Sequence, residues 1–240
     1  MIRPGTVVLL AIFATVAQGG EITFESKPAR THLIELYTSE GCSSCLPAET
    51  WLSTLKDEPR LWQDFVPIAF HVDYWDHLGW RDPFALPRWT ERQADYSTHW
   101  KAESVYTPAF ALDGAAWRSM TLPTVSPDLV GVLRITVNGE RVIASFKPAE
   151  PTKRHYEIHL ARLGFGLGGD VTAGENKGRK LLHDFVVLAL TSEGFKTESK
   201  ELKLPAPSIK SATASRTAIA AWITQAGQLD SIQAVGGWLP

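Results

Sequence analysis

Two cysteines, at the junction between an apolar run and a helical stretch, constrain the fold of this chain most. The 240 residues contain two cysteines, Cys42 and Cys45, separated by two serines. Residues 32–37 (HLIELY) predict a strand, and residues 46–56 (LPAETWLSTLK) predict a helix. At such a turn the positive N-terminus of the helix favours a thiolate over a thiol. We therefore expect dithiol–disulfide chemistry, with a passive local disulfide or half of a metal site as the alternatives.

The beginning of the chain predicts export. Arg3 supplies a positive charge, residues 7–16 are uncharged and mostly apolar, and small residues follow them. This is the order of a signal peptide, expected to comprise residues 1–19, with an uncleaved anchor as the alternative. The apolar run is shorter than the roughly 20 residues that a spanning helix needs. We expect a periplasmic or secreted protein, without stable membrane insertion after signal cleavage, in a compartment where disulfides persist.

The composition limits the partners and the source of stability. The formal net charge is −2, and no basic stripe is present, so nucleic acid is not an expected partner. A disulfide that closes so short a loop restricts the unfolded chain little. With 44% hydrophobic residues, the chain is expected to be stabilised by an apolar core rather than by disulfides.

The first half of the chain alternates predicted strands and helices. Residues 64–72 (DFVPIAFHV) predict a second strand, which completes a strand–helix–strand unit with a parallel strand pair. A second helix is predicted at residues 87–100, and a third strand at residues 104–112. The Asp113-Gly114 dipeptide that follows is a hairpin signal. This order predicts an α/β domain.

A segment rich in proline, serine and threonine, residues 121–128, marks a predicted domain boundary. It separates an α/β domain, residues 28–122, from a β-rich domain, residues 128–240.

Short strands with frequent turns dominate the second half. Residues 133–137 and 141–146 flank Asn138-Gly139, which is a strong hairpin signal. Three further strands are predicted, at residues 156–163, 184–190 and 217–224. This pattern predicts an antiparallel, β-sandwich-like domain.

The order of elements in the first half resembles the thioredoxin fold. Thioredoxin-like proteins carry a cis-proline opposite the C-x-x-C, so the resemblance assigns Thr107 and Pro108 to a substrate-binding groove; a trans proline is the alternative. Thioredoxins also bury an acid in the strand before the site. Glu35 occupies that strand, and a desolvated carboxyl there would relay the proton of Cys45. The alternative is a solvent-facing carboxylate at the sheet edge, and Glu40 is expected to be solvated in the turn.

Longer runs resemble one particular family. The secreted proteins catalogued as domain of unknown function 1223 are similar to this chain over residues 35–45 (ELYTSEGCSSC), 69–76 (AFHVDYWD), 79–84 (GWRDPF), 105–108 (VYTP) and 174–179 (GENKGR). The resemblance covers both predicted domains and implies a thioredoxin-like N-terminal domain, with an activity that is not established. Leu46 departs from it, because many relatives have a proline there.

The function expected from these features is that of a periplasmic thiol–disulfide oxidoreductase. Cys42, expected to be the more exposed cysteine, attacks a substrate disulfide, and Cys45 resolves the mixed disulfide. The expected partners are protein or small-molecule thiols and disulfides, and no cofactor is expected. Trp75 and Trp80 lie in a long loop that is interpreted as a substrate-contacting wall, with core packing as the alternative.

Two other functions remain open from the sequence. One is a non-catalytic binding or scaffolding module, because a fold does not imply a function. The other is a copper-type metallochaperone, with Cys42, Cys45 and His71 as ligands of a soft metal such as Cu(I). His71 enters because it ends the second strand, and ligands of open α/β sheets bind at the carboxyl ends of strands.

Other polar groups receive simpler interpretations. Ser43 and Ser44 are expected to cap the helix. Residues 174–179 are interpreted as a plain turn, because their spacing matches no phosphate loop. No site is assigned to three histidines of the second half, His155, His159 and His183.

Overall fold

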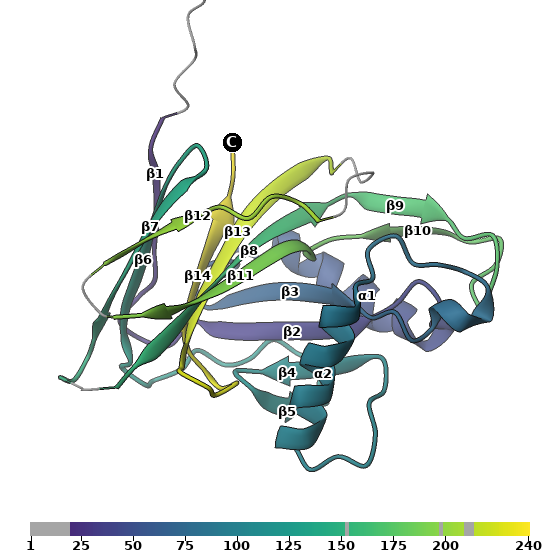
Figure 1. The fold of residues 1–240 in the computed structure, drawn as a ribbon, viewed down its shortest axis with the longest axis horizontal. Coiled ribbons are helices and arrows are strands. Elements are labelled where there is room, and N and C mark those ends of the chain that lie inside the picture. Colours follow the sequence, from purple (N-terminus) through teal and green to yellow (C-terminus); the bar gives the residue numbers. More distant parts are fainter. Residues whose placement is uncertain (1–19, 152–153, 197–198, 209–213) are drawn as a thin grey trace, which may run out of the picture.

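The computed structural model describes residues 20–151, 154–196, 199–208 and 214–240 (Figure 1). The predicted signal peptide, residues 1–19, lies outside these residues. The described residues form a mixed α/β structure, mostly sheet, with two α-helices and three sheets. None of the helices in this part of the chain is both long and apolar enough to cross a membrane.

An eight-stranded sheet forms the centre of the molecule (Figure 1), in the order β14-β13-β8-β11-β3-β2-β4-β5. Its strands are β2 (His32–Thr38), β3 (Phe65–His71), β4 (Ala109–Leu112), β5 (Ala115–Trp117), β8 (Tyr156–Phe165), β11 (Val186–Phe195), β13 (Arg216–Gln225) and β14 (Ser231–Trp238). β2 and β3 are parallel, as the strand–helix–strand pattern predicts, and β4 runs antiparallel to β2. In the strand order of the sheet, β2 and β3 lie near the middle.

Two smaller sheets complete the fold. A four-stranded sheet has the order β1-β6-β7-β12. Its strands are β1 (Ile22–Glu25), β6 (Gly131–Asn138), β7 (Arg141–Pro148) and β12 (Lys200–Lys203), while β9 (Leu167–Asp170) and β10 (Lys180–His183) form a separate pair. The predicted Asn138-Gly139 hairpin is confirmed, because Asn138 pairs with Arg141 between β6 and β7. Ile135 of β6 shares one apolar cluster with Ile158 of β8 and Ile219 of β13, so the four-stranded sheet packs against the large one.

The two α-helices lie on opposite faces of the central strands. They are α1 (Leu46–Thr54) and α2 (Pro87–His99), accompanied by three 3-10 turns, η1 (Ser43–Cys45), η2 (Leu55–Asp57) and η3 (Asp76–Leu78). α2 crosses one face of the sheet (Figure 1), where Glu35 of β2 accepts a hydrogen bond from Tyr96. Thr38 of β2 instead donates to Glu49 of α1. Because neighbouring strand residues point to opposite faces, α1 lies on the other side.

Most predicted elements of the first half are confirmed. Strands and helices stand where the patterns at residues 32–37, 46–56, 64–72 and 87–100 predict them, with ends that differ by a few residues. The strand predicted at residues 104–112 is too long, because β4 begins only at Ala109. The residue before it, Pro108, has no N–H to donate to a neighbouring strand.

Strands from both sides of the predicted boundary share the sheets. Residues 118–128 form neither helix nor strand. Nevertheless β11 pairs with β3, and the Ala69 N–H donates to the Phe185 carbonyl at 2.8 Å. On the other sheet β1 pairs with β6, placing Ile22 opposite Val137. The two halves of the sequence are therefore joined through both larger sheets.

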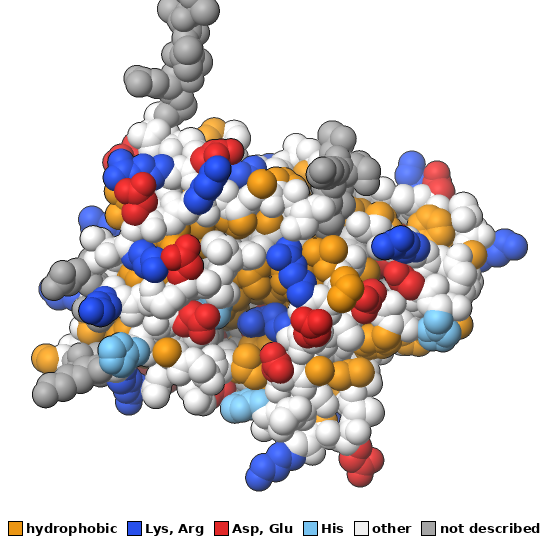
Figure 2. Space-filling view, viewed as in Figure 1, with side chains coloured by type: hydrophobic (Ala, Val, Ile, Leu, Met, Phe, Trp, Pro, Cys, Tyr) orange, Lys and Arg blue, Asp and Glu red, His pale blue; other side chains and the backbone are white. Residues whose placement is uncertain are grey.

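The surface carries charges of both signs. Lys and Arg side chains lie among Asp and Glu side chains over the face shown in Figure 2. Several large aromatic side chains pack in the core. Trp89 and Trp222, for example, are almost fully buried in the main apolar cluster.

Candidate functional site

Cys42 and Cys45 form a disulfide in the turn between β2 and α1. Their Cα atoms lie 5.5 Å apart, and Cys45 is the residue directly before α1. We call residues 39–45 the cysteine turn. Both cysteines have an exposed fraction of 0%. The expectation that Cys42 is the more exposed of the two is therefore wrong, because the surrounding chain covers both.

A loop from the second half of the chain, residues 174–179, packs on the cysteine turn. Glu175 Oε2 accepts hydrogen bonds from the Ser43 N–H at 3.0 Å and from the Ser43 hydroxyl at 2.7 Å. These bonds lower the pKa of Glu175, because they favour its charged form. Asn176 is fully buried and donates to the Glu40 carbonyl at 2.8 Å. Interpreting this loop as a plain turn is thus incomplete, because it fastens the cysteine turn.

The two serines between the cysteines do not cap the helix. No side-chain hydrogen bond caps η1 or α1, so the expected capping role is wrong. The Ser43 hydroxyl is taken by Glu175 instead. Ser44 Oγ lies 3.3 Å from Cys42 Sγ, within hydrogen-bonding distance of sulfur.

A groove of about 590 Å³ opens beside the cysteine turn. It is lined mostly by apolar side chains from α1, β4 and β5 and their flanking loops, namely Ser44, Pro47, Ala48, Tyr106, Pro108, Phe110, Trp117, Arg118 and Met120. The Thr107–Pro108 peptide bond is cis, as the thioredoxin resemblance implies. Ser44 and Pro108 both contribute to the lining, so the groove connects the two features from which a substrate site was expected.

The two tryptophans of the expected substrate wall form hydrogen bonds to residues next to the groove and in the cysteine turn. Neither is among the lining residues of the groove. Trp75 Nε1 donates to the Thr107 hydroxyl at 2.8 Å, and Trp80 Nε1 donates to Glu40 at 2.8 Å. A Cβ on Gly41 would lie 2.7 Å from the Trp75 Cβ, closer than carbon atoms pack. Trp75 therefore contacts the backbone of the cysteine turn closely.

Glu35 is buried but is not brought to the cysteine pair. Its carboxylate accepts hydrogen bonds from Arg92 at 2.9 Å, from Tyr37 at 3.2 Å and from Tyr96. These partners lie on the α2 side of β2, whereas the cysteines lead into α1 on the other side. Burial alone would lower the pKa of Arg92, but the adjacent Glu35 raises it well above its usual value. Glu35 thus forms a buried ion pair across β2 and α2.

Glu40, two residues before Cys42, is fully buried, so the expectation that it is solvated is wrong. Its Oε1 lies 3.0 Å from His183 Nε2, and Trp80 binds its other oxygen. The end of β10 and the loop after β3 cover the turn and enclose this carboxylate.

His71, at the end of β3, is paired with a second buried carboxylate. Its Nδ1 lies 2.7 Å from Asp82 Oδ2, and Asp82 also accepts hydrogen bonds from the N–H groups of Glu40 and Phe84. Burial acts to raise the pKa of Asp82, but the His71 imidazole and these N–H groups hold it below its ordinary value. His71 faces His183, with ring centroids 4.9 Å apart, and among the described residues it groups with Glu49 and His183 rather than with the cysteines.

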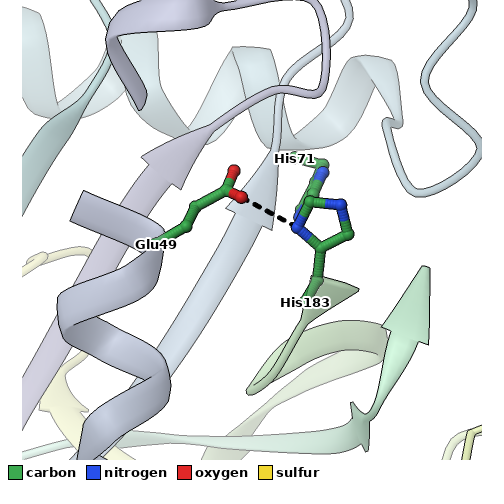
Figure 3. A group of neighbouring side chains, drawn as sticks. All are labelled: Glu49, His71 and His183. Carbon is green, nitrogen blue, oxygen red and sulfur yellow. Dashed lines mark ion pairs between the residues drawn. The ribbon is translucent and has the colours of Figure 1, made fainter. Parts of the chain in front are cut away.

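His183 connects these groups to α1 (Figure 3). Its Nδ1 lies 2.9 Å from Glu49 Oε2. Burial lowers the pKa of His183, but the two carboxylates of Glu49 and Glu40 outweigh it and raise the pKa to about 10. The two carboxylates therefore favour the protonated form of the His183 ring.

Sequence patterns alone do not identify the buried polar cluster that surrounds His183. It consists of Glu40, Glu49, His71, Asp82 and His183. Part of the signal was present, because Glu40, His71 and Asp82 stand in the runs that resemble the family. Glu49 and His183 carry no local motif, and only the fold brings them together.

Comparison with known proteins identifies the family of this chain. The model of the family described as "Protein of unknown function (DUF1223)" matches residues 33–224. The chain belongs to this family. No curated protein matches it. A crystal structure of protein AGR_C_4864 from Agrobacterium tumefaciens is similar, with 24% identity, a TM-score of 0.64, and coverage of 88% of this chain and 94% of that one.

A second solved structure is more distant. HBP35 of Porphyromonas gingivalis has 10% identity and a TM-score of 0.55, and the match covers 88% of this chain and 76% of that one. At these identities the two likenesses show the fold alone. The DUF1223 assignment leaves the chemistry to be inferred from the site itself.

Proposed function

We propose that this protein is an exported, periplasmic or secreted, thiol–disulfide oxidoreductase. Its N-terminal part is a thioredoxin-like unit built from β2, α1, β3, α2, β4 and β5, and its remainder is a β-sandwich-like part. The observation that carries the proposal is the Cys42–Cys45 disulfide directly before α1, beside the groove that Ser44 and Pro108 line. The partners are protein or small-molecule thiols and disulfides.

The reaction needs only the two sulfurs and a substrate with two thiols. A substrate thiolate attacks Cys42 Sγ, the Cys42–Cys45 bond breaks, and Cys45 leaves as a thiolate that takes up a proton. The second substrate thiol loses its proton and attacks the mixed disulfide, which releases Cys42. The substrate is then a disulfide and the cysteine pair is reduced, while the reverse sequence reduces a substrate disulfide.

Access to Cys42 requires a movement of the cysteine turn. Both cysteines are fully buried in the disulfide form. Ser44 stands between them and also lines the groove, so displacing this part of the turn exposes Cys42 on the groove side. Tyr106 and Met120 are exposed at the same groove and supply apolar contacts to a substrate.

A redox titration tests the proposal. The purified protein is equilibrated with glutathione buffers, and its free thiols are counted by alkylation and mass. We expect a reversible two-electron transition within about −270 to −120 mV, the range of known dithiol oxidoreductases, and its loss in Cys42→Ser. A pair that stays oxidised below about −300 mV is a structural disulfide and would overturn the proposal.

A non-catalytic binding module is the second candidate, favoured by one observation. The burial of both cysteines is typical of a disulfide that only holds a turn in shape. In that case a Cys42→Ala, Cys45→Ala variant keeps its partner and its phenotype, whereas an oxidoreductase loses function. The copper site with Cys42, Cys45 and His71 is not carried further, because the two sulfurs bind each other in the disulfide.

A further inference from the structure

Three ligand-bearing side chains from distant parts of the chain meet beneath the cysteine turn. Glu49 lies in the first turn of α1, His71 ends β3, and His183 ends β10 (Figure 3). One nitrogen or oxygen atom from each lies within 4.8 Å of the others. All three are buried, with exposed fractions of 8% or less. We propose that Glu49, His71 and His183 form a binding site for a divalent first-row transition metal.

The outer contacts of the two histidines fit this assignment. Asp82 occupies Nδ1 of His71, which leaves Nε2 as the ligating atom. Glu40 occupies Nε2 of His183, which leaves Nδ1. Histidines that bind a metal almost always donate their other N–H to a carboxylate, a carbonyl or water, which fixes the ring and its tautomer. Here both rings have a buried carboxylate in that position.

The remaining ligand atoms are also positioned for an ion. Thr38 donates to Glu49 Oε1, which orients Oε2 toward the histidines. Glu49 Oε2 and His183 Nδ1 are 2.9 Å apart, close to the separation of two atoms that share a metal at bond lengths of about 2.1 Å. The contact is not aligned as a hydrogen bond, so His183 Nδ1 is a buried polar atom that a metal would satisfy.

The charge of the cluster is compatible with a bound cation. Glu40, Glu49 and Asp82 are three buried carboxylates that face two imidazoles. With neutral imidazoles the cluster is strongly anionic, and buried charge without a partner is costly. A divalent ion compensates most of this charge and lets both histidines bind as neutral rings.

The donor set narrows the choice of metal. Two imidazole nitrogens and one carboxylate suit zinc or iron(II), whereas Cu(I) prefers sulfur and Mg²⁺ and Ca²⁺ prefer oxygen. A small cavity of about 10 Å³ touches Glu49, His71 and His183. Its size is about that of one water molecule, which suits a single bound ion and no larger ligand. The site does not depend on the proposed redox function.

Metal binding by the purified, untagged chain tests the proposal. The protein is stripped with a chelator, loaded with Zn²⁺ or Co²⁺, dialysed, and analysed for metal content. We expect one ion per chain, a Co²⁺ spectrum without the sulfur-to-cobalt charge-transfer band, and a higher thermal midpoint with Zn²⁺. Glu49→Gln and His183→Gln should abolish stoichiometric binding, and Asp82→Asn should weaken it by about 10- to 100-fold.

Two controls make the result specific. His159→Gln removes a buried histidine that contacts Ser192, Thr224 and Trp222 and none of the proposed ligands. A Cys42→Ser, Cys45→Ser variant removes both sulfurs, and both variants should bind Zn²⁺ as the unaltered chain does. Circular dichroism checks that each variant folds, and Asp82→Asn carries the test if His183→Gln does not. Absence of stoichiometric binding, undiminished binding by folded Asp82→Asn and Glu49→Gln, or loss of binding without the cysteines would each overturn the proposal.

Discussion

The Glu35–Arg92 pair shows how a single buried residue can have a different role from the one its position in the sequence implies. The Glu35 side chain is buried and the Arg92 side chain largely so, with exposed fractions of 1% and 13%. Two tyrosine hydroxyls complete the contacts of the carboxylate. Removing one member of a buried pair leaves the other charge uncompensated. The pair is therefore expected to matter for stability.

We expect Glu35→Gln to lower the free energy of unfolding by about 3 kcal/mol, the low end for a broken buried pair, because the amide keeps some hydrogen bonds. Urea denaturation measures the change, and Glu91→Gln, exposed on the same α2, should have little effect. An unchanged stability together with a shifted pH profile of disulfide reduction would instead support the proton relay that the thioredoxin resemblance implies.

At the same scale, the sequence identifies some site residues and not others for a physical reason. Cys42 and Cys45 can be predicted because the chain has only two cysteines and their spacing is local, whereas Pro108 is assigned only through the resemblance to thioredoxins. His183 cannot, because its partner Glu40 is 143 residues away in the sequence. A buried ion pair leaves no local pattern when each half stands on a different element.

Among the elements, the loop of residues 174–179 contacts the cysteine turn directly. Glu175 binds Ser43 through two hydrogen bonds, and Asn176 binds the carbonyl of Glu40. The loop thereby fastens the turn that, under the proposed function, opens before Cys42 reacts. Glu175 itself is at the surface, so its loss should disturb the rest of the fold little.

We expect Glu175→Ala to speed the reduction of the disulfide by dithiothreitol a few-fold, because the variant loses both hydrogen bonds that hold Ser43 and the turn opens more readily. Timed alkylation and mass analysis give the rate. Lys177→Ala, on the same loop, is the matched control and should reduce at the original rate. Equal rates in all three proteins would show that the loop does not limit access.

The strand patterns show where sequence reasoning about elements succeeds and where it does not. Apolar runs such as those of β2 and β3 are recognisable because both strands are buried on both faces. No strand is predicted at β14 (SIQAVGGW), because glycines weaken a strand pattern. In the structure, Gly236 lies against the Trp62 ring and Gly237 against the Phe24 ring, so each glycine makes room for an aromatic side chain.

At the scale of the whole molecule, His159 couples the stability of the large sheet to pH. It lies in β8, stacks on Trp222, and its ring nitrogens contact Ser192 and Thr224. Burial first, and the nearby Arg92 second, lower its pKa from 6.5 to about 3. Between these values the unfolded chain binds a proton that the folded chain does not.

Stability should therefore fall as the pH drops below about 6.5 and continue to fall toward about 3, by up to about 1.4 kcal/mol per pH unit from this group. Above pH 6.5 the ring is neutral in both states and contributes no pH dependence. Carboxylates titrate in the same window, so the measurement is the difference between the original chain and His159→Gln in urea denaturation from pH 7 to 4. Parallel pH profiles of the two proteins would contradict this account.

The pairing of β11 with β3 has a consequence for how the protein can be divided. All seven residues of β3 are buried, and part of their cover comes from strands that follow residue 150. A fragment that stops near residue 122 would leave β3 as an open, apolar sheet edge, the kind that pairs with other chains and aggregates. It would also lack Glu175, Asn176 and His183. The smallest unit that can keep both the cysteine turn and its surroundings is therefore the chain with both halves present.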